Sequence, residues 1–325
     1  MILYVILFFI ALCIGMATSV YAFGTGGKRK KIFEDIYFSV EEVDGIGVVY
    51  TKNGDYSAIL RMENPVQKYS ANIDSYYEFT QLFTAICQTL GEGYAIHKQD
   101  MFTRKHFRDE STDKHEFLSE AYFRYYEGRE YTDSSTYLTI TQENKKSSLF
   151  SFDHKKWRDF MVKVRKVHDQ LKDAGLKASF LGKQETQEYV DRFFAMNFRD
   201  KTVSMTGFKV DEENIGMGDR RCKMYSLVDV DCANLPSVIR PYTNMEVNNT
   251  SMPVDLLSVV DNIPGVQSVV YNQIIFMPNQ KKELAVLDKK KNRHASMPNP
   301  SNLIAVEDIK RVQDVIAREN KQLVY

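Results

Sequence analysis

A histidine and an aspartate lie three residues apart in the most distinctive polar segment of the chain. The segment consists of His97, Lys98, Gln99 and Asp100, followed by Met101 and Phe102. A histidine and a carboxylate that converge on one substrate can act as general base and general acid. The segment follows a predicted strand at residues 94–97, however, and side chains three residues apart on a strand point to opposite faces. We therefore expect a structural cluster at the end of this strand, with acid–base chemistry as the alternative.

The other residues that commonly bind metals or act as nucleophiles show no recognisable spacing. The remaining histidines are His106, His115, His154, His168 and His294, and the cysteines are Cys13, Cys87, Cys222 and Cys232. No two of these histidines have the i, i+4 spacing of a helical metal site, and no two cysteines have metal-ligand spacing. The serines lack the Gly-x-Ser-x-Gly context of a hydrolase. The sequence predicts reduced thiols, no metal site and no catalytic residue.

One glycine-rich segment, residues 24–28, invites comparison with a nucleotide-binding loop. A P-loop requires Gly-x-x-x-x-Gly-Lys-Ser/Thr between a strand and a helix, because its backbone amides cradle phosphates. Here Ala22 replaces the first glycine, Arg29 replaces the hydroxyl residue, and an apolar run replaces the strand. We interpret the segment as a flexible linker and find no other P-loop in the sequence. No cofactor is expected in this chain.

An almost uninterrupted apolar run occupies residues 2–23. About 20 such residues span the hydrocarbon core of a bilayer. The run is followed by Lys28, Arg29, Lys30 and Lys31, and positive charge of this kind remains on the cytoplasmic side of a span. A cleaved signal peptide is the alternative, but its basic residues would precede the apolar run. We expect a single inner-membrane span with its N-terminus outside and the main domain in the cytoplasm.

The charge balance of the chain argues against a general nucleic-acid-binding protein. The 325 residues include 43 basic and 43 acidic side chains, whereas proteins that neutralise phosphates usually carry a basic excess. An aromatic segment is formed by Tyr122, Phe123, Tyr125, Tyr126 and Tyr131 with Arg124 and Arg129. Such residues can stack single-stranded bases, but they more often belong to a core or a protein interface. We expect a core or interface role and no direct nucleic-acid binding here.

Lysines and one arginine cluster at residues 281–293, with three aliphatic residues between them. Basic clusters of this kind can lie near anionic lipid. Glu283 and Asp288 reduce the net charge of the segment. A solvated excursion between a strand and a helix is therefore an equally good interpretation.

Hydrophobic periodicity predicts alternating strands and helices. Strands are expected at residues 94–97, 136–141, 202–210, 222–230 and 266–277, a hairpin at 47–60 around Asn53 and Gly54, and helices at 74–90, 113–127, 154–175, 184–197, 254–260 and 301–320. The Gly-rich turns of a parallel nucleotide-binding sheet are missing, so we expect an α+β fold with mixed or antiparallel sheets covered by helices. The expected organisation is a transmembrane helix at 1–23, a linker at 24–31, and two subdomains at 32–145 and 146–325, the second truncated at its C-terminus.

Three features within residues 46–107 together resemble the N-terminal domain of the TraG-type conjugation ATPases of Bacteroidetes mobile elements. They are the predicted hairpin, the aromatic helix that follows it, and above all the segment His97, Lys98, Gln99, Asp100 and Phe102. The predicted strand at 269–276 also suits this family. The resemblance extends over most of residues 32–325.

The resemblance implies a role in a type IV secretion apparatus, whose inner-membrane ATPase powers channel assembly and substrate transfer. In that family the N-terminal region docks on membrane components, and a C-terminal domain uses ATP and Mg²⁺. This chain lacks the P-loop, so no catalytic residue carries over. The implied function is a docking and assembly region that contacts the inner membrane, other secretion components and, as a homo-oligomer, further copies of the full-length ATPase. The alternative is a membrane-anchored or exported enzyme that uses His97 and Asp100.

Overall fold

The computed structural model describes residues 37–52, 54–64, 73–108, 117–144, 154–199, 208–218, 220–226, 246–247, 250–251, 263–297 and 299–319. Within these residues the chain forms six helices and twelve strands, and the expected α+β class is confirmed. None of the helices in these ranges has the length and apolarity needed to cross a membrane. The expected span at 1–23 and the basic residues Lys28, Arg29, Lys30 and Lys31 lie outside the described residues.

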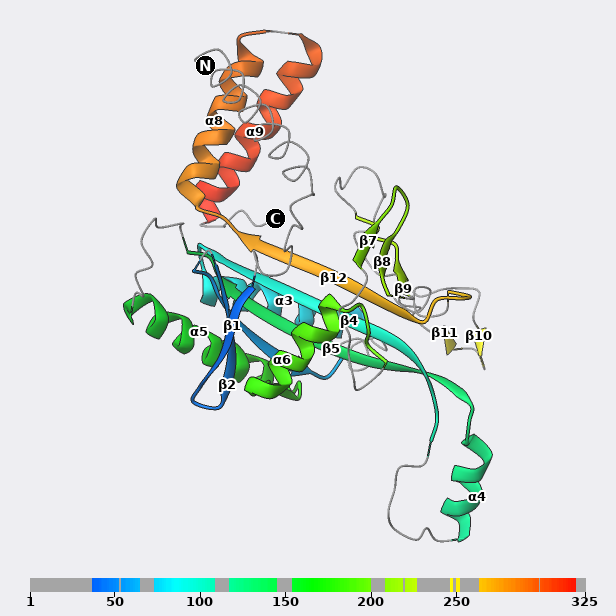
Figure 1. The fold of residues 1–325 in the computed structure, drawn as a ribbon. Helices are drawn as coiled ribbons and strands as arrows, with labels where there is room; N and C mark the ends of the chain where they lie inside the picture. Colours follow the sequence, from blue (N-terminus) through cyan, green and yellow to red (C-terminus); the bar gives the residue numbers. More distant parts are fainter. Residues whose placement is uncertain are drawn as a thin grey trace, which may run out of the picture.

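A seven-stranded sheet forms the centre of the fold (Figure 1). Its strands, in spatial order, are β1 (Tyr37–Val43), β2 (Ile46–Thr51), β3 (Tyr56–Met62), β5 (Glu130–Gln142), β4 (Tyr94–His106) and β12 (Ser268–Met277), and β6 (Ala178–Phe180) pairs with β3 beside β2. Every pairing in this sheet is antiparallel. The predicted division near residue 145 does not separate two sheets, because β6 and β12 complete the sheet that β1 begins.

Two turns shape the first three strands. The predicted hairpin between β2 and β3 is confirmed, but Tyr50 pairs with Tyr56, so its loop is longer than a two-residue turn. The two-residue turn lies instead at Asp44 and Gly45, which have φ angles of 51° and 76° and join β1 to β2. Asp-Gly favours this type I′ geometry because both central residues require positive φ.

One face of the sheet carries the hydrophobic core beneath α3 (Ile73–Leu90) and α5 (His154–Asp173). The periodic apolar side chains of both helices face the strands, as their spacing predicts. Fully buried members of this core include Ile86, Leu90, Phe160, Val164 and Leu171 from the helices and Leu60, Ile96, Leu138 and Ile140 from the strands. The core therefore fixes which strand residues point toward these helices and which point away.

The opposite face is partly covered by α6 (Lys183–Phe194) (Figure 1). Its N-terminal end approaches β2 at Gly47, whose amide donates to the carbonyl of Leu181 at 2.7 Å. A Cβ added at Gly47 would lie 2.6 Å from the carbonyl oxygen of Gly182 and would also collide with Thr186. Glycine at this position therefore permits the close approach of α6 to the sheet.

Several elements extend from this body (Figure 1). The strands β4 and β5 continue as a long two-stranded ribbon to α4 (Phe117–Tyr126), and β12 leads into a hairpin of α8 (Gln280–Ala295) and α9 (Pro300–Glu319). Two small antiparallel sheets consist of β7 (Phe208–Val210), β8 (Ile215–Met217) and β9 (Arg220–Cys222), and of β10 (Glu246–Val247) and β11 (Thr250–Ser251). No residue of α4 or α8 is buried, so the surfaces of these two projections are candidate binding surfaces.

Two predicted elements differ from the structure. A strand was expected at 222–230, but β9 covers Arg220–Cys222 and residues 223–226 have no regular structure. Residues 227–230 lie outside the described residues. The solvated excursion considered for 281–293 is instead helix α8, which Asn279 caps by accepting a hydrogen bond from the amide of Lys282. The expected helix at 254–260 lies outside the described residues.

Candidate functional site

The segment singled out by the sequence lies inside β4, between β5 and the edge strand β12, and not at a strand end as expected, because β4 continues to His106. Since neighbouring side chains on a strand alternate between faces, Lys98, Asp100 and Phe102 share the face covered by α3 and α5, whereas His97 and Gln99 point to the face of α6. His97 and Asp100 therefore do not converge. The alternative of an acid–base pair receives no support from this geometry.

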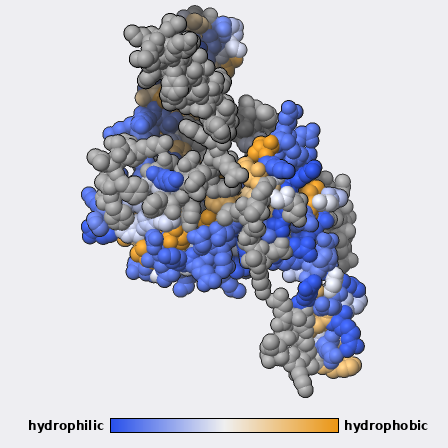
Figure 2. Space-filling view, in the orientation of Figure 1, coloured by the Kyte–Doolittle hydropathy of each residue, from blue (hydrophilic) through white to orange (hydrophobic). Residues whose placement is uncertain are grey.

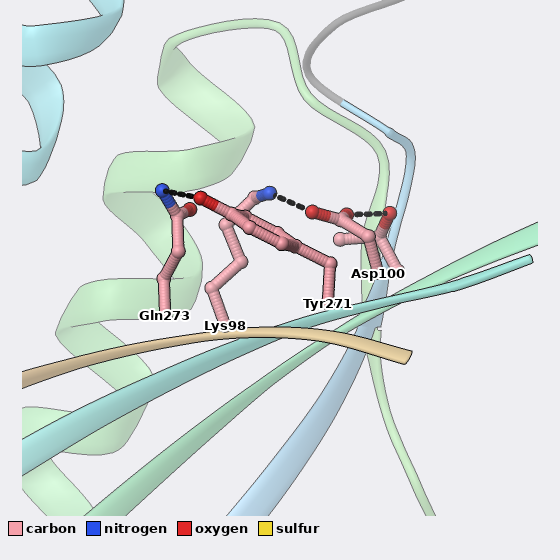
Figure 3. Close-up of polar contacts among 5 residues, drawn as sticks. Lys98, Asp100, Tyr271 and Gln273 are labelled. Carbon is pink, nitrogen blue, oxygen red and sulfur yellow. Dashed lines mark hydrogen bonds and ion pairs between the residues drawn. The ribbon is translucent and has the colours of Figure 1, made fainter. Parts of the chain in front are cut away.

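Lys98 and Asp100 form a buried ion pair (Figure 3). The second oxygen of Asp100 accepts a hydrogen bond from the hydroxyl of Thr136 on β5 at 2.7 Å. Relative exposures are 6% for Lys98 and 1% for both Asp100 and Thr136. Both carboxylate oxygens are thus occupied and almost inaccessible to solvent. An isolated buried charge would be very unfavourable, so each member of the pair makes the burial of the other possible.

Residues of β12 border this ion pair on the same side of the sheet (Figure 3). Tyr271 lies opposite Asp100 in the register and Gln273 lies opposite Lys98. The amide of Gln273 donates to the hydroxyl of Tyr271 at 3.3 Å. We call Lys98, Asp100, Thr136, Tyr271 and Gln273 the polar cluster. Sequence reasoning missed Tyr271 and Gln273 as its members, because nothing local indicates that β12 pairs with β4.

A second set of polar contacts fixes the other face of β4. Asn272 Oδ1 accepts hydrogen bonds from Gln99 Nε2 at 2.7 Å and from His97 Nε2 at 2.9 Å. His97 Nε2 must carry a hydrogen here, because a carbonyl oxygen only accepts. Burial lowers the pKa of His97 and its bond to Asn272 offsets this in part. The imidazole is therefore mainly neutral at pH 7 and acts as a hydrogen-bond donor to β12.

A polar cleft of about 290 Å³ lies between α6 and the same face of the sheet. Its lining includes three cations, Arg61, Lys105 and Arg192, and three acids, Asp133, Glu185 and Glu188. The acids already have partners: Asp133 pairs with Lys105, Glu185 accepts from the amide of Gly182, and Glu188 accepts from Gln184. Tyr189 also lines the cleft, and burial, followed by the nearby Tyr137, raises the pKa of its hydroxyl, which stays neutral.

Helix α4 carries the aromatic segment, and none of its residues is buried. Phe123 is turned inward and stacks on Phe107 with ring centroids 5.8 Å apart. Leu118, Ala121, Tyr122 and Tyr125 occupy i, i+3, i+4 and i+7 positions and are all exposed. This spacing places them on one face of a helix. We call these four residues the arm stripe. In Figure 2, orange hydrophobic surface is visible on this arm among blue residues.

No group of three potential metal ligands occurs among the described residues. No protein-family model matches the chain, and no curated protein has a matching sequence.

Proposed function

We propose that this chain is the membrane-anchored docking and assembly region of a conjugative transfer ATPase. The resemblance of residues 46–107 to the TraG-type family supports this proposal, together with the apolar run at 2–23. The main domain is proposed to lie in the cytoplasm, at the inner membrane. Its partners are other type IV secretion components and neighbouring copies of the full-length ATPase.

The buried ion pair of Lys98 and Asp100 favours a structural role for the segment that carries the resemblance. A general acid or base must reach the proton that it transfers, whereas Asp100 is 1% exposed and held by two partners. His97 is engaged with Asn272 on the other face. A free-standing enzyme built on His97 and Asp100 would need both side chains in one accessible pocket. The cluster instead links β4 to β5 through the hydrogen bond between Thr136 and Asp100, and its members Tyr271 and Gln273 lie beside the ion pair on β12.

The arm stripe is the single observation that carries the docking role. Leu118, Tyr122 and Tyr125 are 79%, 59% and 58% exposed, respectively, at the end of the ribbon. An amphipathic helix with apolar residues at these spacings typically inserts into a groove on a partner. Tyrosine is enriched at protein interfaces because its ring is large and rigid and has a polar tip. The helix is thus suited to a protein partner.

Neighbouring residues hold the rings of α4 in position before any partner binds. The guanidinium of Arg129 lies 3.6 Å from the ring centroid of Tyr125, and Phe107 supports Phe123 from below. Glu120 and Arg124 pair with each other at 2.7 Å, outside the stripe. Rings that are already positioned lose less conformational entropy when a partner binds. Membrane tethering further raises the effective concentration of membrane partners, so a small interface of this kind suffices.

Site-specific photocrosslinking in donor cells tests this proposal. A benzophenone amino acid replaces Tyr122 in the full chain, in cells that carry the complete transfer apparatus. Crosslinked products are isolated and identified by mass spectrometry. We expect a dominant adduct with a membrane component of the apparatus.

Val162 provides a matched control position, because it is 63% exposed on α5. We expect no such adduct from position 162. Equal labelling from both positions, or adducts of position 122 with proteins unrelated to transfer, would contradict the docking role. A mating assay with Tyr122→Ser and Tyr125→Ser adds a functional readout: transfer frequency should fall while the amount of protein stays constant.

A further inference from the structure

Helix α8 presents a row of basic residues along one side, and its two acids lie to the sides of this row. Lys282, Val286, Lys289 and Arg293 follow one another at i, i+4, i+7 and i+11, and all four are exposed. This spacing places them along one side of the helix. Lys281 and Lys290 are also exposed and flank the row. We call these six residues the basic face.

The two acids of α8 do not neutralise the basic face. Asp288 pairs with Lys291 at 2.8 Å and accepts a hydrogen bond from Gln313 of α9 at 2.8 Å. Glu283 is partly buried and lies about 100° around the helix axis from Lys282, to the side of the row. The five cations of the basic face have no acidic partner among the described residues. Their positive charge is therefore available to an outside surface.

The basic face is held in a fixed orientation relative to the sheet. Glu92 bridges the start of α8, accepting from Asn279 Nδ2 at 2.8 Å and from the amide of Gln280 at 3.1 Å. Farther along, Lys291 donates to Gln313 at 2.9 Å and His294 bonds Asn302 at 2.8 Å, which ties α8 to α9. A surface positioned in this way loses little freedom when it binds.

We propose that the basic face of α8 rests on the anionic lipid surface of the membrane that holds the expected N-terminal span. This inference depends on the proposed function, which places the chain at a membrane. Lysine clusters attract anionic headgroups, and Val286 adds an aliphatic contact between the cations. Nucleic acid is the less suitable partner, because α8 carries no Phe, Tyr or Trp that could stack on bases, and its His294 is engaged by Asn302 of α9.

Lysine acetylation, read by mass spectrometry, measures the contact residue by residue. The full chain is reconstituted with vesicles of phosphatidylcholine alone or of phosphatidylcholine mixed with phosphatidylglycerol. Each cation near an anionic surface strengthens binding roughly five-fold, so labelling of Lys282 and Lys289 should slow at least about five-fold in the anionic vesicles. Salt at about 1 M shortens the Debye length to about 3 Å and should abolish this difference.

Lys166 and Lys172 are matched internal controls, because both are exposed on α5. Their labelling should be the same in the two kinds of vesicle. Equal labelling of Lys282 and Lys289 in both vesicles would overturn the inference. So would protection of these lysines by a DNA oligonucleotide but not by anionic vesicles.

Two double variants distinguish the effect of the basic face from the effect of a similar charge change elsewhere on the protein. Lys289→Glu with Arg293→Glu should make the labelling of Lys282 independent of lipid composition, while Lys166→Glu with Lys172→Glu should preserve the difference. All four positions are exposed, so both variants are expected to fold, and circular dichroism checks this. Flotation with neutral vesicles tests the anchor separately: failure to float contradicts the proposed function, whereas the labelling difference decides the role of α8.

Discussion

The ion pair of Lys98 and Asp100 lies on β4, and the arm stripe lies on α4 at the end of the ribbon that β4 and β5 form, yet their exposures are reversed. Lys98 and Asp100 are 6% and 1% exposed in the middle of β4, while Leu118 and Tyr122 are 79% and 59% exposed beyond its end. Where β12 and two helices surround the strands, charged groups are paired and enclosed. Where the ribbon leaves its neighbours, apolar groups stay open. Charged residue types that suggest catalysis are thus enclosed here, and apolar residue types that suggest a core are exposed on α4.

Removing the carboxylate of Asp100 is expected to have the largest effect. Asp100→Ala leaves the Lys98 ammonium buried without its partner, and breaking a buried pair in this way costs about 3–5 kcal/mol. Urea denaturation of the full chain in mild detergent measures this loss. The double variant Lys98→Met with Asp100→Leu removes both charges and should recover most of the stability, because well-packed apolar residues can replace a buried pair.

Asp133 supplies the matched control for that experiment. It pairs with Lys105 on the outer part of the same ribbon, where the side chains are 39% and 34% exposed. Exposed pairs contribute about 0–1 kcal/mol, so Asp133→Ala should change the midpoint of unfolding only slightly. Similar losses for Asp100→Ala and Asp133→Ala would show that the polar cluster is not closed to solvent.

A substitution at Gly47 tests how much the close packing of α6 against the other face of the sheet contributes to stability. Gly47→Ala places a methyl group 2.6 Å from the carbonyl oxygen of Gly182. Overpacking of this kind costs about 1–3 kcal/mol, and it should also loosen α6. Hydrogen exchange of the α6 amides, together with urea denaturation, measures both effects.

Gly182→Ala serves as the control for the packing change. The nearest atom to its added Cβ is Glu185 Oε2 at 4.0 Å, and its φ angle of −71° suits any residue. We expect a loss under about 1 kcal/mol. If both alanine variants behave alike, the close approach of α6 at Gly47 is not needed for the fold.

Local patterns in the sequence predict most of the elements but not how they meet. Helix α3 was expected at 74–90 and runs from Ile73 to Leu90, because its apolar residues recur with helical spacing. Helix α8 was not predicted, since few of its residues are apolar and its inner side is fastened to α9 by polar contacts. The turn at Asp44 and Gly45 carries an Asp-Gly pair, which is a local signal for a two-residue hairpin turn.

The candidate site depended on pairing over long distances in the chain. Strand alternation correctly separated His97 from Asp100, which requires only local geometry. The partner of His97 is Asn272, 175 residues away, and no turn or spacing in either segment specifies this contact. The burial of Lys98 and Asp100 was equally unpredictable from local patterns, because it results from the assembled sheet and helices. Whether a side chain is exposed depends on the assembled fold, and residue type alone does not predict it.

The contact between His97 and Asn272 predicts a modest pH dependence. Burial lowers the pKa of His97 in the folded state, so protonation at this site favours the unfolded chain. The stabilising contribution is complete above the ordinary histidine pKa of about 6.5 and is lost as pH falls toward the lower, folded-state value. Unfolding free energies at a series of pH values between neutral and mildly acidic measure this loss. His97→Gln keeps a donor for Asn272 but does not titrate, so its pH profile should be flatter than that of the unmodified chain.

Changing the arm stripe is expected to have the smallest effect on stability. Tyr122→Ser with Tyr125→Ser removes two rings that are 59% and 58% exposed, and surface substitutions away from a core usually change stability by less than about 0.5 kcal/mol. Urea denaturation of this variant should therefore match that of the unmodified chain. Phe123→Ser is the informative counterpart, because Phe123 stacks on Phe107 and holds α4 to the ribbon. It should raise hydrogen exchange in α4, whereas the double tyrosine variant should not. A loss of stability in the double tyrosine variant would mean that the stripe supports the fold itself, and its exposure would then no longer favour a partner.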